Sequence, residues 1–158
     1  MVLEDGVHCY EVLQNALNFQ QSISDCQSRD THLVTLTSQT EFDFVISLLE
    51  ESMQYLNMYE RMCVSLIFCN NFLVISDSVL AVHIDLNDEG NSPNDYQFTS
   101  HQETESPFFL WLDGQPDNNN DHCVNINVLN AAMNDVPCST EYPRVCEIES
   151  EWIVSIIL

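Results

Sequence analysis

Hydrophobic and polar positions in the first third of the chain follow both strand and helix periods. Residues 8–12 have the composition of a short strand, and residues 31–36 alternate between polar and apolar side chains. Between these segments, Ser22 is predicted to cap a short helix that carries Ile23 and Cys26 on one face. The pattern therefore predicts strand, helix and strand in this order.

A second helix is predicted to begin at Ser38. Ser38 and Glu41 have the spacing of a capping box, in which the hydroxyl accepts the N3 amide and the glutamate reaches back to the cap amide. The residues that follow form one apolar stripe at i, i+3, i+4 and i+7: Phe42, Val45, Ile46 and Leu49.

Residues 83–148 alternate short apolar runs with clusters of Asn, Asp, Gly and Pro. Turn-forming residues at this frequency predict short strands joined by long loops. Two helices early and short strands late predict an α+β domain.

Residues 56–82 differ from both neighbouring regions because they are almost free of acidic residues and rich in Val, Leu, Ile and Phe. As a genuine part of the fold they would form one or two buried strands, with Cys63 and Cys69 as a local bridge. The alternative is that part of this segment is translated intron or a gene-model error, and the same alternative applies to residues 152–158.

Charge and cysteine content narrow the possible partners. The chain has 25 acidic residues, three arginines and no lysine, with a formal charge of −22. Nucleic-acid phosphate and anionic membranes are therefore poor partners, whereas cations are attracted. No apolar run has the length of a membrane span.

The seven cysteines indicate an oxidising compartment, and no CxxC pair or zinc spacing occurs. The chain begins without a signal peptide, which suggests a fragment or a mispredicted start.

The densest group of oxygen ligands is formed by Gln115, Asp117, Asp121, Asn134 and Asp135. Calcium takes roughly six to eight oxygens from carboxylates, amides, carbonyls and water. A bridge between Cys123 and Cys138 would bring the two halves of this group together across 15 residues, and closing that loop would contribute about 3 kcal/mol.

Asn and Asp also gather in turns, where they bond their own backbone, so each of these residues taken alone is equally a turn residue. Pro116 favours the ligand interpretation, because a cis peptide bond would aim Gln115 and Asp117 toward one point. We therefore expect the Gln115–Pro116 bond to be cis.

These motifs resemble the C-type lectin-like domain family. The resemblance rests on residues 111–117 (WLDGQPD), 123–126 (CVNI), 134–138 (NDVPC) and 145–147 (VCE), and on Cys9-Tyr10, Cys26, residues 32–34 and the Ser38–Glu41 helix start. It implies one domain over residues 8–148, with 56–82 as an atypical insertion and 149–158 as a tail. The implied fold has two helices, small antiparallel sheets and a long calcium-binding loop region.

The resemblance also implies the disulfide bonds Cys26–Cys146 and Cys123–Cys138. Cys9 resembles the second cysteine of an N-terminal hairpin whose partner would precede residue 1. The family's principal calcium site falls on Gln115, Asp117, Asp121, Asn134 and Asp135, and the first four of these residues would also hydrogen-bond a sugar. In this family the order Gln-Pro-Asp goes with galactose-type sugars, and the order Glu-Pro-Asn goes with mannose-type sugars.

Several positions depart from the family pattern. Galactose binders of the family place a tryptophan and a glycine-rich loop just after Gln-Pro-Asp, whereas residues 118–122 contain neither tryptophan nor glycine, and Met133 stands in place of another tryptophan. The usual Trp-Ile-Gly-Leu core strand reads His83-Ile84-Asp85-Leu86. His122 replaces an acid of an auxiliary calcium site, so no second calcium ion is predicted. His83 and His122 are interpreted as packing or surface residues.

The sequence therefore predicts an extracellular, non-catalytic lectin that binds galactose- or N-acetylgalactosamine-type glycans with calcium as cofactor. The alternative is a domain of the same family that binds a protein partner and has lost sugar binding. Asp117 and Asp121 are a conceivable acid–base pair, but no nucleophile, phosphate-loop or metal-hydrolase motif accompanies them, so an enzyme is not predicted.

Overall fold

The computed structural model describes residues 2–3, 6–54, 81–90, 94–99, 106–117 and 119–150. Most of the proposed insertion, residues 56–80 with Cys63 and Cys69, lies outside the described residues, as does the end of the tail from residue 151. Ala81 and Val82, the last two residues of that segment, begin a strand, and Val82 is fully buried.

The described residues contain two α-helices, α1 (Phe19–Gln27) and α2 (Gln39–Gln54). Seven strands form one sheet, and a 3-10 turn, η1 (Val128–Asn130), separates two of them. The strands are β1 (Val2–Leu3), β2 (Gly6–Leu17), β3 (His32–Leu33), β4 (Ala81–Asn87), β5 (Cys123–Asn127), β6 (Ala132–Val136) and β7 (Tyr142–Ser150). Neither described helix is long and apolar enough to cross a membrane. The α+β class predicted from the sequence is confirmed.

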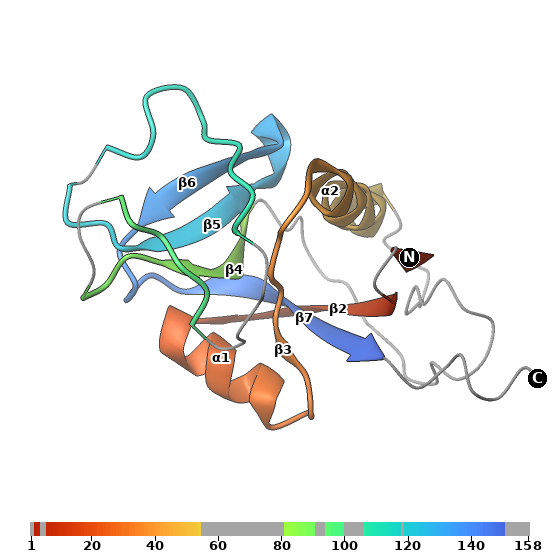
Figure 1. Cartoon of the computed structure of the whole chain (residues 1–158). Helices are drawn as coiled ribbons and strands as arrows, with labels where there is room; N and C mark the ends of the chain where they lie inside the picture. Colours follow the sequence, from red (N-terminus) through yellow and green to blue (C-terminus); the bar gives the residue numbers. More distant parts are fainter. Residues whose placement is uncertain are drawn as a thin grey trace, which may run out of the picture.

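The sheet has the order β1-β2-β7-β4-β5-β6, and β3 pairs with β7. In Figure 1 the two helices flank the β2–β7 pair, and β4, β5 and β6 extend from it toward the loops that follow β4. All pairings are antiparallel except that of β4 with β7, which is parallel at His83↔Arg144. The prediction of small antiparallel sheets therefore needs one correction: the parallel contact joins them into a single mixed sheet.

The second helix begins as the sequence predicts. The amide of Glu41 donates to Ser38 Oγ at 3.2 Å, and the Ser38 amide donates to Glu41 Oε2 at 3.2 Å. The four residues of the predicted apolar stripe are buried in the larger core cluster.

The first helix begins earlier than predicted. Its cap is Asn18, which forms a capping box with Gln21, and Ser22 lies buried inside the helix. The amide of Phe19 donates to the Cys138 carbonyl, a contact over a long sequence distance that no local pattern could indicate.

A smaller core cluster contains the disulfide bonds Cys26–Cys146 and Cys123–Cys138. The first of these bonds ties α1 to β7, and the second joins β5 to the residues after β6. Cys9 lies half-buried on β2.

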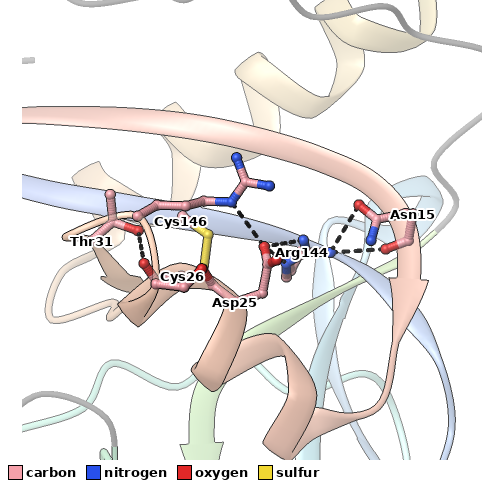
Figure 2. Close-up of polar contacts among 8 residues, drawn as sticks. Asn15, Asp25, Cys26, Thr31, Arg144 and Cys146 are labelled. Atoms are coloured by element: carbon pink, nitrogen blue, oxygen red, sulfur yellow. Dashed lines mark hydrogen bonds and ion pairs between the residues drawn. A yellow bond between two sulfur atoms is a disulfide. The ribbon is translucent and has the colours of Figure 1, made fainter.

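The ion pair beside the Cys26–Cys146 disulfide bond crosses from β7 to α1 (Figure 2). Arg144 is fully buried; its Nε donates to Asp25 Oδ2 at 3.1 Å, and its Nη1 donates to the Asn15 carbonyl at 2.9 Å. The more exposed Arg29 donates to the same Asp25 oxygen at 3.0 Å. Burial raises the pKa of Asp25, but the hydrogen bonds from Arg144 and Arg29 outweigh it and hold the pKa below its usual value.

Buried polar groups also link β2, β7 and the start of α2. His8 Nδ1 lies 2.6 Å from Glu147 Oε1, and Glu147 Oε2 accepts the Thr35 amide at 3.2 Å. The carboxylate of Glu41 lies close to both side chains. Glu41 Oε2 also accepts the Thr37 amide and hydroxyl. The cluster therefore links β2 and β7 to the segment that leads into α2.

Substitution of the buried arginine tests the ion pair. We expect Arg144→Met to lower the free energy of unfolding by about 1–3 kcal/mol, because it removes the hydrogen bonds of a fully buried guanidinium, while the partly exposed Asp25 keeps Arg29 as a partner. Arg29→Met is the matched control, since it removes the exposed cation from the same carboxylate and should cost less than about 1 kcal/mol. Urea denaturation of both variants measures the difference. Equal losses would contradict the assignment.

His83 should make stability depend on pH. Burial lowers the pKa of His83, and its hydrogen bond with the Thr140 carbonyl only partly opposes this effect. The unfolded chain takes up a proton near pH 6.5, whereas the folded chain keeps the imidazole neutral. The free energy of unfolding should therefore fall as the pH drops below about 6.5, by up to about 1.4 kcal/mol per pH unit.

His83→Phe retains a ring between Phe19 and Tyr142 and removes this contribution. Urea denaturation at two pH values on either side of neutrality should show a smaller pH difference for the variant. An unchanged difference would mean that His83 does not contribute.

Candidate metal site

The candidate ligands lie on two segments that the sheet holds together. Gln115, Asp117 and Asp121 belong to the loop before β5, and Asn134 and Asp135 belong to β6. Strands β5 and β6 pair with Val124 opposite Asp135. The Cys123–Cys138 disulfide bond closes the same pair of strands, with 5.0 Å between the Cα atoms.

Backbone hydrogen bonds fix residues 110–115, the part of the loop just before the candidate ligands. The Met133 amide donates to the Leu110 carbonyl at 2.7 Å, and the Leu112 amide donates to the Met133 carbonyl at 2.8 Å. A turn then brings the Gln115 amide to the Leu112 carbonyl at 2.9 Å, with Gly114 at a φ of +84° that favours glycine. The Gln115–Pro116 bond is cis, as the sequence predicts.

Three of the predicted ligands are in direct contact. The Asp117 amide donates to Gln115 Oε1 at 3.0 Å and to Asp135 Oδ2 at 3.1 Å. Asp135 is buried, at 3 % exposed, whereas Asp117 is exposed and Gln115 is half-buried. The loop and β6 therefore present their oxygen atoms to one another.

Asp121 completes a group of three carboxylates. Burial raises the pKa of Asp121, and the negative charges of Asp135 and Asp117 raise it further, while His122 opposes them. Like charges this close disfavour ionisation of one another, and a divalent cation would relieve the repulsion. Three carboxylates with nearby amide oxygens have the chemistry that suits calcium. Asn134 is placed by its position alone, before Asp135 and opposite Asn125 of β5.

The turn interpretation also finds support at Asp117. Its Oδ1 accepts the Asn119 amide at 3.1 Å, and its Oδ2 accepts Asn119 Nδ2 at 2.7 Å. Both oxygens of Asp117 thus have a local partner. A cation at Asp117 has to compete with these two hydrogen bonds.

Sequence reasoning missed the role of Asp88 next to this group. Asp88 is buried after β4, and its carboxylate accepts the Asn94 amide at 2.9 Å. Its Oδ1 lies 2.8 Å from Nδ1 of the exposed His122. The Asp88 amide also donates to the His122 carbonyl at 2.9 Å. This pair therefore links β4 to the end of the loop that carries Gln115, Asp117 and Asp121, which we call the ligand loop. The only sequence signal was an acid at the end of a buried strand.

Removal of one carboxylate tests whether the group interacts. We expect Asp117→Asn to lower the pKa of Asp121 toward its ordinary value, because one of the charges that raise it is lost. Carboxyl-carbon NMR titration without added metal measures this pKa. Asp113→Asn, an exposed change in the same loop, is the matched control and should leave the Asp121 pKa in place. The same response in both variants would argue against a local cluster.

Comparison with known proteins places these features in context. A family model described as "Lectin C-type domain" matches residues 15–148. The chain is 25 % identical over 151 residues to rat C-type lectin domain family 4 member A, covering 91 % of this chain and 51 % of that protein.

Two solved structures are similar in fold. Human lithostathine has a TM-score of 0.69 at 20 % identity, with 94 % of this chain and all of that chain covered. The C-type lectin domain of murine dendritic cell inhibitory receptor 2, solved in complex with N-glycan, has a TM-score of 0.65 at 21 % identity, with 95 % of this chain and 100 % of that chain covered. The chain spans between 50 % and 59 % of the length of the curated relatives that it matches.

Proposed function

The chain belongs to the C-type lectin domain family, whose members are non-catalytic binding domains, and we propose that it binds carbohydrate with calcium as its cofactor. The observation that carries this proposal is the approach of three carboxylates, Asp117, Asp121 and Asp135, at one end of a disulfide-closed strand pair. A fixed group of like charges is costly for a protein unless a cation offsets it.

Gln115, Asp117, Asp121, Asn134 and Asp135 are the residues proposed to hold the ion. Calcium, when bound, supplies a positive centre that two vicinal hydroxyls of a sugar can reach. The protein contributes the orientation of the surrounding oxygen and amide groups. Asp135 is buried on β6 and accepts the Asp117 amide, and this contact between sheet and loop supports the proposed ligand set.

We assign the specificity to Gln115 and Asp117. The Gln115 amide offers a hydrogen-bond donor, and the Asp117 carboxylate is a pure acceptor. This order corresponds to the Gln-Pro-Asp arrangement that the family resemblance associates with galactose-type sugars. The N-glycan bound by the similar murine receptor domain supports carbohydrate as the ligand class.

The proposed domain extends from residue 8 to residue 148, with residues 56–82 as an insertion. The two disulfide bonds among the described residues are typical of a domain that folds in an oxidising compartment, and we propose an extracellular location.

Binding of a protein partner is the second candidate. The Asn119 hydrogen bonds to Asp117 favour it, because they occupy oxygens that a metal and a sugar would share. Residues 119–122 also offer no tryptophan, tyrosine or phenylalanine ring for a sugar to pack on.

Retention on a galactose resin tests the first candidate. We expect the oxidised protein to bind the resin in millimolar calcium and to elute with chelator. Asp117→Ala should abolish both retention and calcium binding in isothermal titration, because it removes an oxygen ligand from both. Asp113→Ala, in the same loop, should change neither.

The double variant Gln115→Glu with Asp117→Asn keeps the total number of side-chain oxygen atoms and exchanges the positions of the amide and the carboxylate. It should keep calcium binding and move its preference toward mannose-type sugars. Stabilisation by calcium without retention on any sugar resin would favour a protein partner. Absence of calcium binding in the wild-type protein would contradict the proposed cofactor.

A further inference from the structure

A hollow beside the candidate metal site has no role in the function proposed so far. It has a volume of about 320 Å³ and is lined by Asn94, Tyr96, Phe109, Trp111 and Pro116. This volume lies at the small end of the range for small-molecule sites, which is about 300–1,000 Å³. We call these five residues the aromatic hollow.

The aromatic rings of the hollow form one continuous group. The Trp111 ring lies 5.1 Å from the Tyr96 ring and 5.8 Å from the Phe109 ring, measured between centroids. Phe109 and Trp111 are nearly parallel, at 13°, and Phe109 is 42 % exposed. Exposed apolar surface next to a concavity is a mark of a ligand site.

The aromatic hollow adjoins the group of carboxylates. Pro116 lines the hollow and lies between Gln115 and Asp117 in the chain. The Tyr96 hydroxyl donates to the Asp121 carbonyl at 3.5 Å. The amide of Asn94, which lines the hollow, donates to the carboxylate of the buried Asp88 at 2.9 Å. Asp88 and the three carboxylates of the candidate site together carry more negative charge than one calcium ion offsets, so the surroundings of the hollow stay negative.

The aromatic rings and the nearby negative charges together favour some ligands of the hollow over others. Aromatic walls match the apolar C–H face of a pyranose ring, and the nearby carboxylates repel sialic, uronic or sulfated residues. A single monosaccharide at the metal would leave the hollow unused. The next residue of the same glycan would reach it across Pro116.

We propose that the aromatic hollow is a second carbohydrate subsite that receives a neutral pyranose ring linked to the residue held at the metal site. This inference rests on the proposed function. It supplies the large aromatic surface that residues 119–122 lack, from residues elsewhere in the chain. It also makes the domain selective for neutral oligosaccharides over acidic ones.

Isothermal titration in calcium with methyl β-galactoside and with lactose tests the proposal. We expect lactose to bind about tenfold more tightly, a gain of about 1.4 kcal/mol. Phe109→Ala should reduce this gain to less than about twofold while leaving the affinity for methyl β-galactoside unchanged. A disaccharide with glucuronic acid as its second residue should show no gain over methyl β-galactoside in the wild-type protein.

Leu129→Ala is the matched control, since Leu129 is 70 % exposed and does not line the hollow. It should preserve the tenfold gain. Equal affinity of the wild-type protein for lactose and methyl β-galactoside, or a gain that survives Phe109→Ala, would overturn the subsite while leaving the proposed function in place. Failure of both sugars to bind would remove the proposed function and the subsite together.

Discussion

Electrostatic repulsion among neighbouring carboxylates is the constraint on which the site depends. Asp117, Asp121 and Asp135 approach one another in a chain that carries 25 acidic residues and three arginines. Two of those arginines, Arg29 and Arg144, contact Asp25 and do not neutralise the group. Contacts other than ion pairs must therefore hold these carboxylates close together. A cation that binds among them would lower their electrostatic repulsion.

Those contacts are covalent and backbone links. The Cys123–Cys138 disulfide bond closes the strand pair that carries Asp135, which limits how far the carboxylates can separate. Hydrogen bonds from Met133 and Leu112 fasten the ligand loop to β6, and the Asp88–His122 contacts fasten its far end to β4. These links hold the two segments that carry the candidate ligands near one another. Asn119 opposes cation binding, because it donates two hydrogen bonds to the Asp117 carboxylate, and a cation would have to compete with them.

Local sequence signals predicted the parts of the fold that are locally determined. The helix after Ser38 could be placed because its cap and its apolar stripe lie within a few residues of one another. The start of the first helix was misplaced, because Ser22 offered a plausible cap while the real start at Asn18 is supported by a bond from Phe19 to Cys138. The parallel contact between His83 and Arg144 depends on the meeting of distant strands, which no local pattern encodes. The candidate ligand residues were proposed from their motif, whereas the aromatic hollow was missed because Tyr96 is separated along the chain from Phe109 and Trp111.

The candidate ligands differ in burial, and this difference separates residues that would hold the ion from residues that would meet the sugar. Asp135 is buried on β6, Gln115 and Asp121 are half-buried, and Asp117 is exposed. A buried carboxylate is held firmly but is costly to leave unpaired, so it suits the inner side of an ion. An exposed residue keeps its contact with solvent and can meet a ligand without rearrangement of the core. The pair that sets sugar preference in our proposal, Gln115 and Asp117, thus lies on the outer side, and Pro116 between them borders the aromatic hollow. An exchange of this pair alters recognition where the scaffold constrains it least, because the buried Asp135 and the disulfide bond stay unchanged.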